Sequence, residues 1–231
     1  MGNIKVVLWD IDGTLLNFQA AEKAAINKCF QIHGLGICTD EMLAQYSEIN
    51  HKYWKMLERG EMIKPEILVG RFKEFFEKQG LDVSVAAAFN EDYQFELGNT
   101  VCFEENAMEV ILSLKPEVKQ YAVTNGTRVA QKRKLANSGL DKQFEKAFIS
   151  DEIGVEKPML GFFDAVWAEI GDYPKKEVLI VGDSLTSDMQ GGVNAGILTC
   201  WYNPKGVDNT SGLKLDYEIR NLAQVLDIVK V

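Results

Sequence analysis

Two aspartates separated by one residue follow directly after an apolar run near the start of the chain. Asp10 and Asp12 lie in residues 10–14, which read Asp-Ile-Asp-Gly-Thr, and residues 6–9 before them read Val-Val-Leu-Trp. Four consecutive apolar residues indicate a buried parallel strand, and open α/β sheets bind ligands beyond the carboxyl ends of such strands. Two carboxylates this close repel each other unless a cation or a shared reaction stabilises them. The segment therefore predicts a reactive or metal-binding site.

Two simpler interpretations of this segment compete with that prediction. Asp and Gly favour turns, so the segment could be an acidic turn between a strand and a helix. A calcium loop fits less well, because Leu15 stands at the sixth position, where such a loop has glycine. Ala21 stands at the twelfth position in place of the closing glutamate.

Polar side chains also follow three later segments that are expected to be strands. The candidates are Thr124 and Asn125 after residues 119–123, Lys157 after residues 147–149, and Asp183 and Asp188 after residues 178–181. If these strands are parallel to residues 6–9, all their carboxyl ends lie along one edge of the sheet. The sequence therefore predicts that these groups converge.

Each of these candidates also has a structural interpretation. Asn125 could belong to a hairpin turn, although Val129, Lys132 and Leu135 recur beyond it at helical spacing. Other ordinary roles are a helix cap at Thr124 or Thr127, a solvated lysine at Lys157, and turn or N-cap positions at Asp183 and Asp188. All of these interpretations would have to hold together, which makes a shared site the better explanation.

The candidate residues suit phosphoryl transfer with a bound divalent metal. Carboxylate oxygens favour Mg²⁺, and the set contains no Cys or His that would favour zinc. With the metal bound, Asp10 could attack phosphorus. Asp12 would donate a proton to the leaving ester oxygen and then accept one from water. Thr124 and Lys157 would hold the phosphoryl oxygens during transfer.

Composition limits the classes of protein to which this chain can belong. The 231 residues carry a net charge of −9, which argues against binding to a nucleic-acid polymer. No apolar run is long enough to cross a membrane, and the N-terminus lacks the pattern of a signal peptide. Four cysteines without a paired motif suggest a reducing, cytoplasmic setting. The expected partner is a small-molecule substrate, and no protein partner or oligomeric state is indicated.

Hydrophobic spacing predicts a doubly wound α/β fold interrupted by a helical insertion. Four helical stripes occupy residues 18–97, with Thr39 as an N-cap, Pro65 at a helix start and Gly34 and Gly80 as stops. Strands and helices alternate beyond residue 99, which predicts a mainly parallel sheet. We expect a Rossmann-like catalytic core at residues 1–16 and 99–231 and a helical-bundle cap at residues 17–98, with hinges near residues 15–17 and 98–99.

The order of these segments resembles the haloacid dehalogenase (HAD) superfamily of phosphatases. Its four motifs match Asp-Ile-Asp-Gly-Thr at 10–14, Thr-Asn-Gly at 124–126, Lys-Pro at 157–158 and Gly-Asp-Ser-Leu-Thr-Ser-Asp at 182–188. The resemblance implies an aspartyl-phosphate mechanism with Asp10 as nucleophile and Asp12 as acid and base. It also implies Mg²⁺ bound by Asp10, Asp183 and the main-chain carbonyl of Asp12, with Asp188 supporting the metal and Lys157. Phosphate would bind Thr124 and the backbone at Asn125.

A narrower resemblance concerns the substrate. Residues 48–54, 70–72, 191–196 and 199–201 look like the pyrimidine 5′-nucleotidase branch, which acts on deoxyuridine, uridine and thymidine monophosphates and noncanonical analogues. If so, Asn50, Trp54 and Arg71 in the cap would select the nucleoside. Trp54 could instead belong to the core of the bundle, and Arg71 could be a solvated charge on a helix.

Several other functions share parts of this pattern. A phosphatase for a sugar phosphate, N-acylneuraminate 9-phosphate or phosphoglycolate would use the same motifs. A phosphosugar mutase would share the aspartyl-phosphate, and a non-catalytic module would bind phosphate without turnover. A dehalogenase would need neither Mg²⁺ nor a second acidic residue, so Asp12 argues against it.

Overall fold

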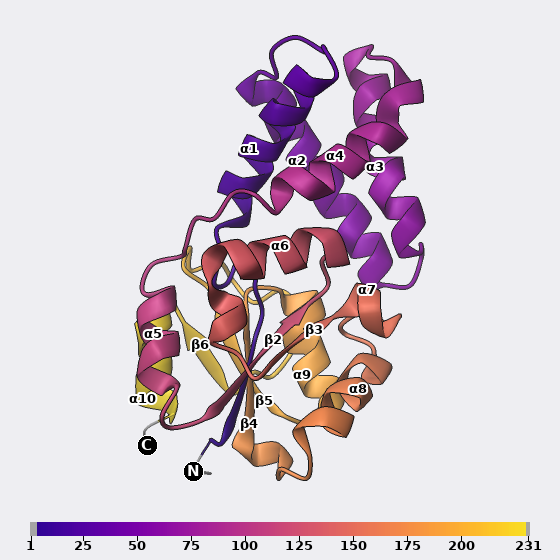
Figure 1. Ribbon diagram of the computed structural model, residues 1–231. Coiled ribbons are helices and arrows are strands. Elements are labelled where there is room, and N and C mark those ends of the chain that lie inside the picture. Colours follow the sequence, from indigo (N-terminus) through magenta and orange to yellow (C-terminus); the bar gives the residue numbers. More distant parts are fainter. Residues whose placement is uncertain (1–3, 230–231) are drawn as a thin grey trace. The chain divides into compact units, whose positions relative to one another are not determined.

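The chain folds into two compact units. The computed structural model describes residues 4–229. Of these residues, 4–18 and 101–229 form the core unit, and 19–100 form the helical unit (Figure 1). Both boundaries lie within two residues of those expected from the sequence. Within the described residues, no helix is both long and apolar enough to cross a membrane.

The core unit is built on a six-stranded, fully parallel sheet. Its strands are β1 (Val6–Trp9), β2 (Lys119–Thr124), β3 (Lys146–Ile149), β4 (Val178–Gly182), β5 (Leu198–Tyr202) and β6 (Tyr217–Ile219). The order is β3-β2-β1-β4-β5-β6, so β1 lies between β2 and β4. This order places the residues after β1, β2 and β4 side by side at one edge, as expected from the sequence.

Both faces of the sheet are buried, which explains the continuous apolar runs of its central strands. In β1, Val7 and Trp9 pack into one hydrophobic cluster, whereas Val6 and Leu8 pack into the other. The first cluster includes side chains of the helices at residues 107–114, 128–138 and 225–229, and the second includes side chains of the helices at residues 160–170 and 190–195. Alternating side chains therefore anchor β1 to helices on both faces.

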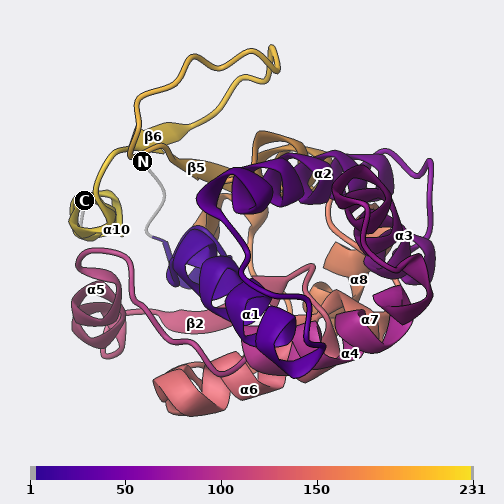
Figure 2. The same cartoon turned by 90° about the horizontal axis from the view of Figure 1, so that it is seen from above.

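The helices of the core unit follow the strands in a βα alternation (Figure 1). They are α5 (Ala107–Leu114), α6 (Arg128–Ser138), α7 (Ser150–Ile153), α8 (Leu160–Ile170), α9 (Gln190–Ala195) and α10 (Val225–Val229). A π-helical turn, Leu185–Met189, precedes α9, and 3₁₀ turns lie at Leu140–Lys142, Lys175–Glu177 and Leu222–Gln224. Figure 2 shows the segment between β5 and β6 extending away from the sheet.

The helical unit contains four helices around an aromatic core. They are α1 (Phe18–Ile32), α2 (Asp40–Glu58), α3 (Lys64–Gln79) and α4 (Ala86–Leu97), with a 3₁₀ turn at Val83–Val85. Thr39 caps α2 by accepting a hydrogen bond from Met42 N, and Gly80 ends α3 in a left-handed conformation. Phe72 is buried at the centre, 5.0 Å from the ring of Tyr46 and 4.9 Å from that of Phe89.

Helix α6 is present where the sequence predicts a helix, but its buried face is partly polar. Val129, Lys132 and Leu135 lie on this helix, as their spacing predicts, but Val129 is 47% exposed and Lys132 is also exposed. Gln131 and Lys134 are buried instead, together with Leu135. The helix therefore turns polar side chains inward, which hydrophobic spacing alone does not predict. The short helix α7 and the π-helical turn were not predicted either.

The two segments that lead out of and back into the core unit pair with each other. Leu16 and Phe103 form an antiparallel bridge. Asn17 N donates a hydrogen bond to Cys102 O at 2.8 Å, and Glu104 N donates one to Leu15 O at 3.0 Å. Residues 15–17, expected to act as a hinge, are thus held by backbone hydrogen bonds within the core unit.

Candidate active site

A buried lysine joins the loops that follow three strands. Lys157 Nζ lies 2.8 Å from Asp10 Oδ1 and 2.6 Å from Asp188 Oδ1, and it donates to Val123 O at 2.8 Å. Lys157 is only 1% exposed, so it is not the solvated lysine of the alternative interpretation. These contacts bring together groups that lie 147 and 31 positions apart in the sequence. The expected convergence is therefore present.

Three carboxylates form an all-oxygen cluster beside this lysine. One oxygen from each of Asp10, Asp183 and Asp188 lies within 4.8 Å of the others. Asp10 and Asp188 are buried, whereas Asp183 is exposed. The Thr14 hydroxyl lies 3.2 Å from Asp10 Oδ2 and 3.4 Å from Asp183 Oδ1. Three carboxylates facing one lysine leave excess negative charge, and a hard divalent cation such as Mg²⁺ suits this donor set.

Two glycines allow the carboxylates to approach the backbone. Gly13 has φ +89°, and a Cβ there would lie 2.6 Å from Asp183 Oδ2. A Cβ on Gly182 would lie 2.3 Å from Asp188 Cγ. Both distances are too short for an ordinary contact, so any larger residue would displace an acidic side chain. The glycines in the first and fourth motifs thus leave the space that the carboxylates occupy.

The local charges change the acidity of the nucleophile candidate. Burial, followed by repulsion from Asp188, raises the pKa of Asp10 to about 7. Burial alone would lower the pKa of Lys157, but attraction to Asp10 and Asp188 raises it above its ordinary value. Lys157 is therefore a permanent cation between the two aspartates at neutral pH.

The second motif provides a hydroxyl, backbone amides and a clamp on Lys157. Asn125 Nδ2 donates to Lys157 O and Asn125 Oδ1 accepts from Lys157 N, both at 2.8 Å. The Asn125 side chain thus fixes the backbone that carries Lys157. Thr124 is buried at the end of β2, and its hydroxyl accepts from Gly126 N at 3.1 Å. Thr127, not Thr124, caps α6 through Ala130 N.

The fourth motif holds its two aspartates by different means. Asp188 lies on the π-helical turn, and its Oδ2 accepts from Ser184 N at 3.1 Å while its Oδ1 faces Lys157. The N-cap of this turn is Ser184, whose hydroxyl accepts from Ser187 N. Trp201 Nε1 donates to the carbonyl oxygen of Asp183 at 2.9 Å. The aspartates therefore do not serve as simple turn or N-cap residues.

Asp12 is held by two residues that sequence analysis missed. Lys134 Nζ forms an ion pair with Asp12 Oδ1, and Gln131 Nε2 donates to Asp12 Oδ2 at 2.6 Å. Both residues lie on α6, three positions apart, so they project from the same side of the helix. Their spacing directly after the Thr-Asn-Gly motif was the only signal in the sequence.

The three residues expected to select a substrate lie in the helical unit. Arg71 is buried against the rings of Phe72 and Tyr93, with its Cζ 5.0 and 5.2 Å from their centroids. Its Nη1 donates to Asn50 Oδ1 at 2.6 Å, and Asn50 Nδ2 donates to Glu22 Oε1 at 2.9 Å. Arg71 is thus not a solvated charge. Trp54 is half-buried.

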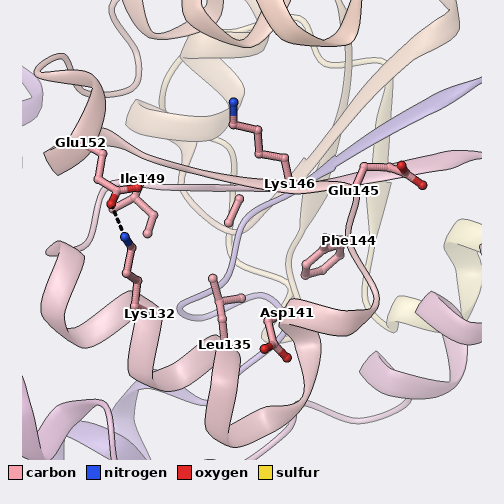
Figure 3. A pocket seen from close by; sticks show the side chains of 9 residues that line it. Lys132, Leu135, Asp141, Phe144, Glu145, Lys146, Ile149 and Glu152 are labelled. Carbon is pink, nitrogen blue, oxygen red and sulfur yellow. Dashed lines mark ion pairs between the residues drawn. The ribbon is translucent and has the colours of Figure 1, made fainter.

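A separate hollow of about 320 Å³ opens beside strand β3 (Figure 3). It is lined by Lys132, Leu135, Asp141, Phe144, Glu145, Lys146, Ala147, Ile149 and Glu152. At one side of the hollow, Lys132 and Glu152 point toward each other and form an ion pair, with 2.5 Å between Nζ and Oε1. None of the carboxylates described above lines it, so this hollow is distinct from the candidate active site.

Several known proteins align with this chain over nearly its whole length. YfnB of Bacillus subtilis (strain 168), named as a HAD-hydrolase, is 34% identical over 100% of this chain and 97% of its own length. The pyrimidine 5′-nucleotidase PynA of Streptococcus pneumoniae is 33% identical, covering 96% of this chain and 94% of PynA. The pyrimidine 5′-nucleotidase YjjG of Escherichia coli is 26% identical, covering 95% of each.

A structural match and a family match agree with these sequence similarities. A crystal structure of YfnB, described as bound to magnesium, matches with a TM-score of 0.94 at 33% identity over 100% of both chains. Residues 4–196 match the family of haloacid dehalogenase-like hydrolases. The parallel sheet, the inserted helices and the four motif loops that meet at Asp10 are thus those of a hydrolase, and this chain belongs to the haloacid dehalogenase-like hydrolases.

Proposed function

We propose that this protein is a Mg²⁺-dependent phosphomonoesterase that acts through an aspartyl-phosphate on Asp10. The observation that carries the proposal is the convergence of Asp10, Lys157 and the carboxylates of the fourth motif at one edge of the sheet. Asp10 presents a carboxylate for attack, and the chain supplies both a proton carrier and a cation nearby. Asp10, Asp183 and the main-chain carbonyl of Asp12 would hold Mg²⁺, with Asp188 supporting them. When bound, the metal offsets the charge of the carboxylates and of the incoming phosphate.

The first step transfers the phosphoryl group to the protein. A carboxylate oxygen of Asp10 attacks phosphorus, a new Asp10–phosphorus bond forms, and the bond from phosphorus to the ester oxygen breaks. Asp12 donates a proton to the departing ester oxygen, which leaves as an alcohol. Lys157, the Thr124 hydroxyl and the backbone N–H of Asn125 are the donors available to the phosphoryl oxygens.

The second step returns the protein to its starting state. Asp12, now a carboxylate, accepts a proton from water, and the water oxygen attacks phosphorus. The bond between Asp10 and phosphorus breaks, so inorganic phosphate leaves and Asp10 becomes a carboxylate again. The two aspartates thus have separate roles, and Asp12 is protonated once more before the next cycle.

For the substrate, we propose a pyrimidine nucleoside 5′-monophosphate: dUMP, UMP, dTMP or a noncanonical analogue. This assignment is supported by the two relatives named as pyrimidine 5′-nucleotidases, which align over most of their length. Asn50, Trp54 and Arg71 of the helical unit are proposed to select the nucleoside. Arg71 and Asn50 are fixed by Glu22 and by aromatic rings, so their positions are defined before substrate arrives.

A panel of phosphate esters tests both parts of this proposal. Phosphate release is measured with pyrimidine nucleotides, purine nucleotides, sugar phosphates and phosphoglycolate, each with and without Mg²⁺. Fast, Mg²⁺-dependent release from pyrimidine nucleotides supports the whole proposal. Equal rates on purine nucleotides or faster rates on sugar phosphates would overturn the substrate class and leave the phosphatase assignment in place. Phosphate binding without turnover would overturn the phosphatase assignment.

A further inference from the structure

The two residues that hold Asp12 are buried polar groups on helix α6. Lys134 is 1% exposed and Gln131 is fully buried, whereas Lys132 between them is exposed. Burying an ammonium and an amide is costly unless each finds a partner. The ammonium of Lys134 and the amide nitrogen of Gln131 find theirs in the same carboxylate, that of Asp12. Asp12 therefore explains the burial of both donors, whereas the amide oxygen of Gln131 is buried without a hydrogen-bond partner among the described residues.

These contacts engage each oxygen of Asp12 separately. Lys134 takes Oδ1 and Gln131 takes Oδ2, so the carboxylate cannot rotate about its last bond without losing one of them. Lys134 itself lies beside the ring of Phe18, 5.3 Å from its centroid. Each Asp12 oxygen still has a lone pair for another hydrogen bond, because a carboxylate accepts about four in total.

The same helix also connects Asp12 to the phosphate-binding loop. Gln131 packs so closely under Gly126 that a Cβ on that glycine would lie 2.2 Å from Gln131 Nε2. Gly126 N in turn donates to the Thr124 hydroxyl. The loop that would bind the phosphoryl oxygens and the carboxylate that would move the proton thus have a common support, helix α6.

We infer that Lys134 and Gln131 are positioning residues that fix the Asp12 carboxylate in the orientation from which it exchanges protons with the ester oxygen and with water. The inference rests on the proposed phosphatase function and adds to it. Both residues contact Asp12, the proposed acid and base, whereas Asp10, the proposed nucleophile, pairs with Lys157. Their loss therefore affects the proton transfers made by Asp12 and leaves attack by Asp10 intact.

Esters that differ in their need for a proton test this inference. The enzyme is Mg²⁺-loaded, and single-turnover rates are compared for p-nitrophenyl phosphate and for uridine 5′-monophosphate, or for the fastest alkyl ester of the panel. Nitrophenolate leaves without a proton, whereas an alcohol needs one. We expect Lys134→Met to slow the alkyl ester about tenfold or more and the aryl ester less than about threefold. Gln131→Met should show the same selectivity if Lys134→Met does not fold.

A second readout follows the phosphoenzyme. With p-nitrophenyl phosphate, Lys134→Met should accumulate phosphorylated Asp10 in acid-quenched samples, because the water step still needs Asp12 as base. In a double-mutant cycle, Lys134→Met should add little to the loss caused by Asp12→Asn, because both changes remove the same proton transfer. Lys132→Met is the matched control, since Lys132 lies on the same helix and pairs with Glu152 instead.

The possible outcomes separate the inference from the function on which it rests. Equal slowing of both esters without phosphoenzyme, or rates equal to those of Lys132→Met, would overturn the positioning role while the wild type remains a phosphatase. Independent, additive losses in the double-mutant cycle would also overturn it. A wild-type protein that releases phosphate from neither ester would overturn the proposed function and the inference with it.

Discussion

At the scale of single residues, the two aspartates of the first motif pair with different lysines. Lys157 is buried between Asp10 and Asp188 and neutralises part of their repulsion. Lys134 forms an ion pair with Asp12. The aspartate that would attack and the aspartate that would carry the proton therefore have different basic partners. This separation allows each carboxylate to be tested by itself.

Replacing Asp10 with asparagine should abolish turnover without harming the fold. The amide cannot attack phosphorus, so we expect kcat to fall by at least about a thousandfold. Because the pKa of Asp10 is raised to about 7, the folded protein holds its proton more tightly than the unfolded chain does. Ionisation of Asp10 above that pH therefore costs stability, and neutral Asn should raise Tm at about pH 8 in the presence of a chelator. A lower Tm would contradict the proposed electrostatics.

The same raised pKa predicts that Mg²⁺ binding depends on pH. Below about pH 7, Asp10 carries a proton that a metal must displace, and above it the carboxylate is already free. The increase in Tm caused by Mg²⁺ should therefore be larger at about pH 8 than at about pH 6. Thermal denaturation at both pH values measures it. Asp10→Asn should remove most of the difference, and equal increases in the wild type would contradict the prediction.

At the scale of elements, short and irregular segments place the reactive groups on a regular sheet. The π-helical turn Leu185–Met189 carries Asp188 back toward the end of β4, where Gly182 leaves room for it. Helix α6 holds the Asp12 side chain in place through Lys134 and Gln131. The sheet fixes the strand ends, and these flanking segments fix the side chains.

The space left by Gly182 can be tested directly. A methyl group there would push the Asp188 carboxylate away from Lys157, because the added carbon would lie 2.3 Å from Asp188 Cγ. A displacement of about 1 Å in an active site can cost about a hundredfold in rate, so we expect a loss of that order in kcat for Gly182→Ala. Gly161→Ala in α8 is the control, because a Cβ there has ordinary contacts. Full activity in Gly182→Ala would contradict the role given to Asp188.

The aromatic core of the helical unit predicts a large effect at Phe72. This ring is buried and packs against four aromatic neighbours: Tyr46, Phe76, Phe89 and Tyr93. Phe72→Ala should lower the free energy of unfolding by about 3–5 kcal/mol, measured by denaturant titration. Ile37→Ala, at an 86% exposed position, should change it by less than about 0.5 kcal/mol. Similar effects for the two variants would show that the ring does not stabilise the unit.

At the scale of the whole molecule, we propose that the core unit carries the chemistry and the helical unit selects the substrate. All the motif residues belong to the core unit, and the proposed specificity residues belong to the helical unit. In enzymes with a lid, closure of the lid excludes water and completes the contacts with the substrate.

Removal of the helical unit tests this division of labour. If residues 17–98 are replaced by a short linker, the remaining core should keep slow activity on small, generic phosphate esters and lose its preference among nucleotides. Circular dichroism and thermal denaturation establish that the shortened chain is folded. A folded core with no activity, or one with the original preference, would contradict the division.

Much of this arrangement could be predicted from the sequence, and particular residues explain why the rest could not. The apolar run at Val6–Trp9 and the polar residues after each strand indicate a parallel sheet and its active edge. The buried polar residues were missed because Gln131 and Lys134 look like surface residues until their partner Asp12 is known. Arg71 was ambiguous for the same reason. Hydrophobic spacing identifies apolar cores, whereas buried charge depends on contacts between distant segments.

The most direct test of the account is to find where the phosphoryl group resides during turnover. The Mg²⁺-loaded enzyme is quenched with acid while it hydrolyses a pyrimidine nucleotide, and the peptides are mapped by mass spectrometry. We predict one phosphoryl group on the peptide that contains Asp10, assigned to that residue and absent from Asp10→Asn. Steady turnover with phosphate on another residue would contradict the claim that Asp10 is the nucleophile.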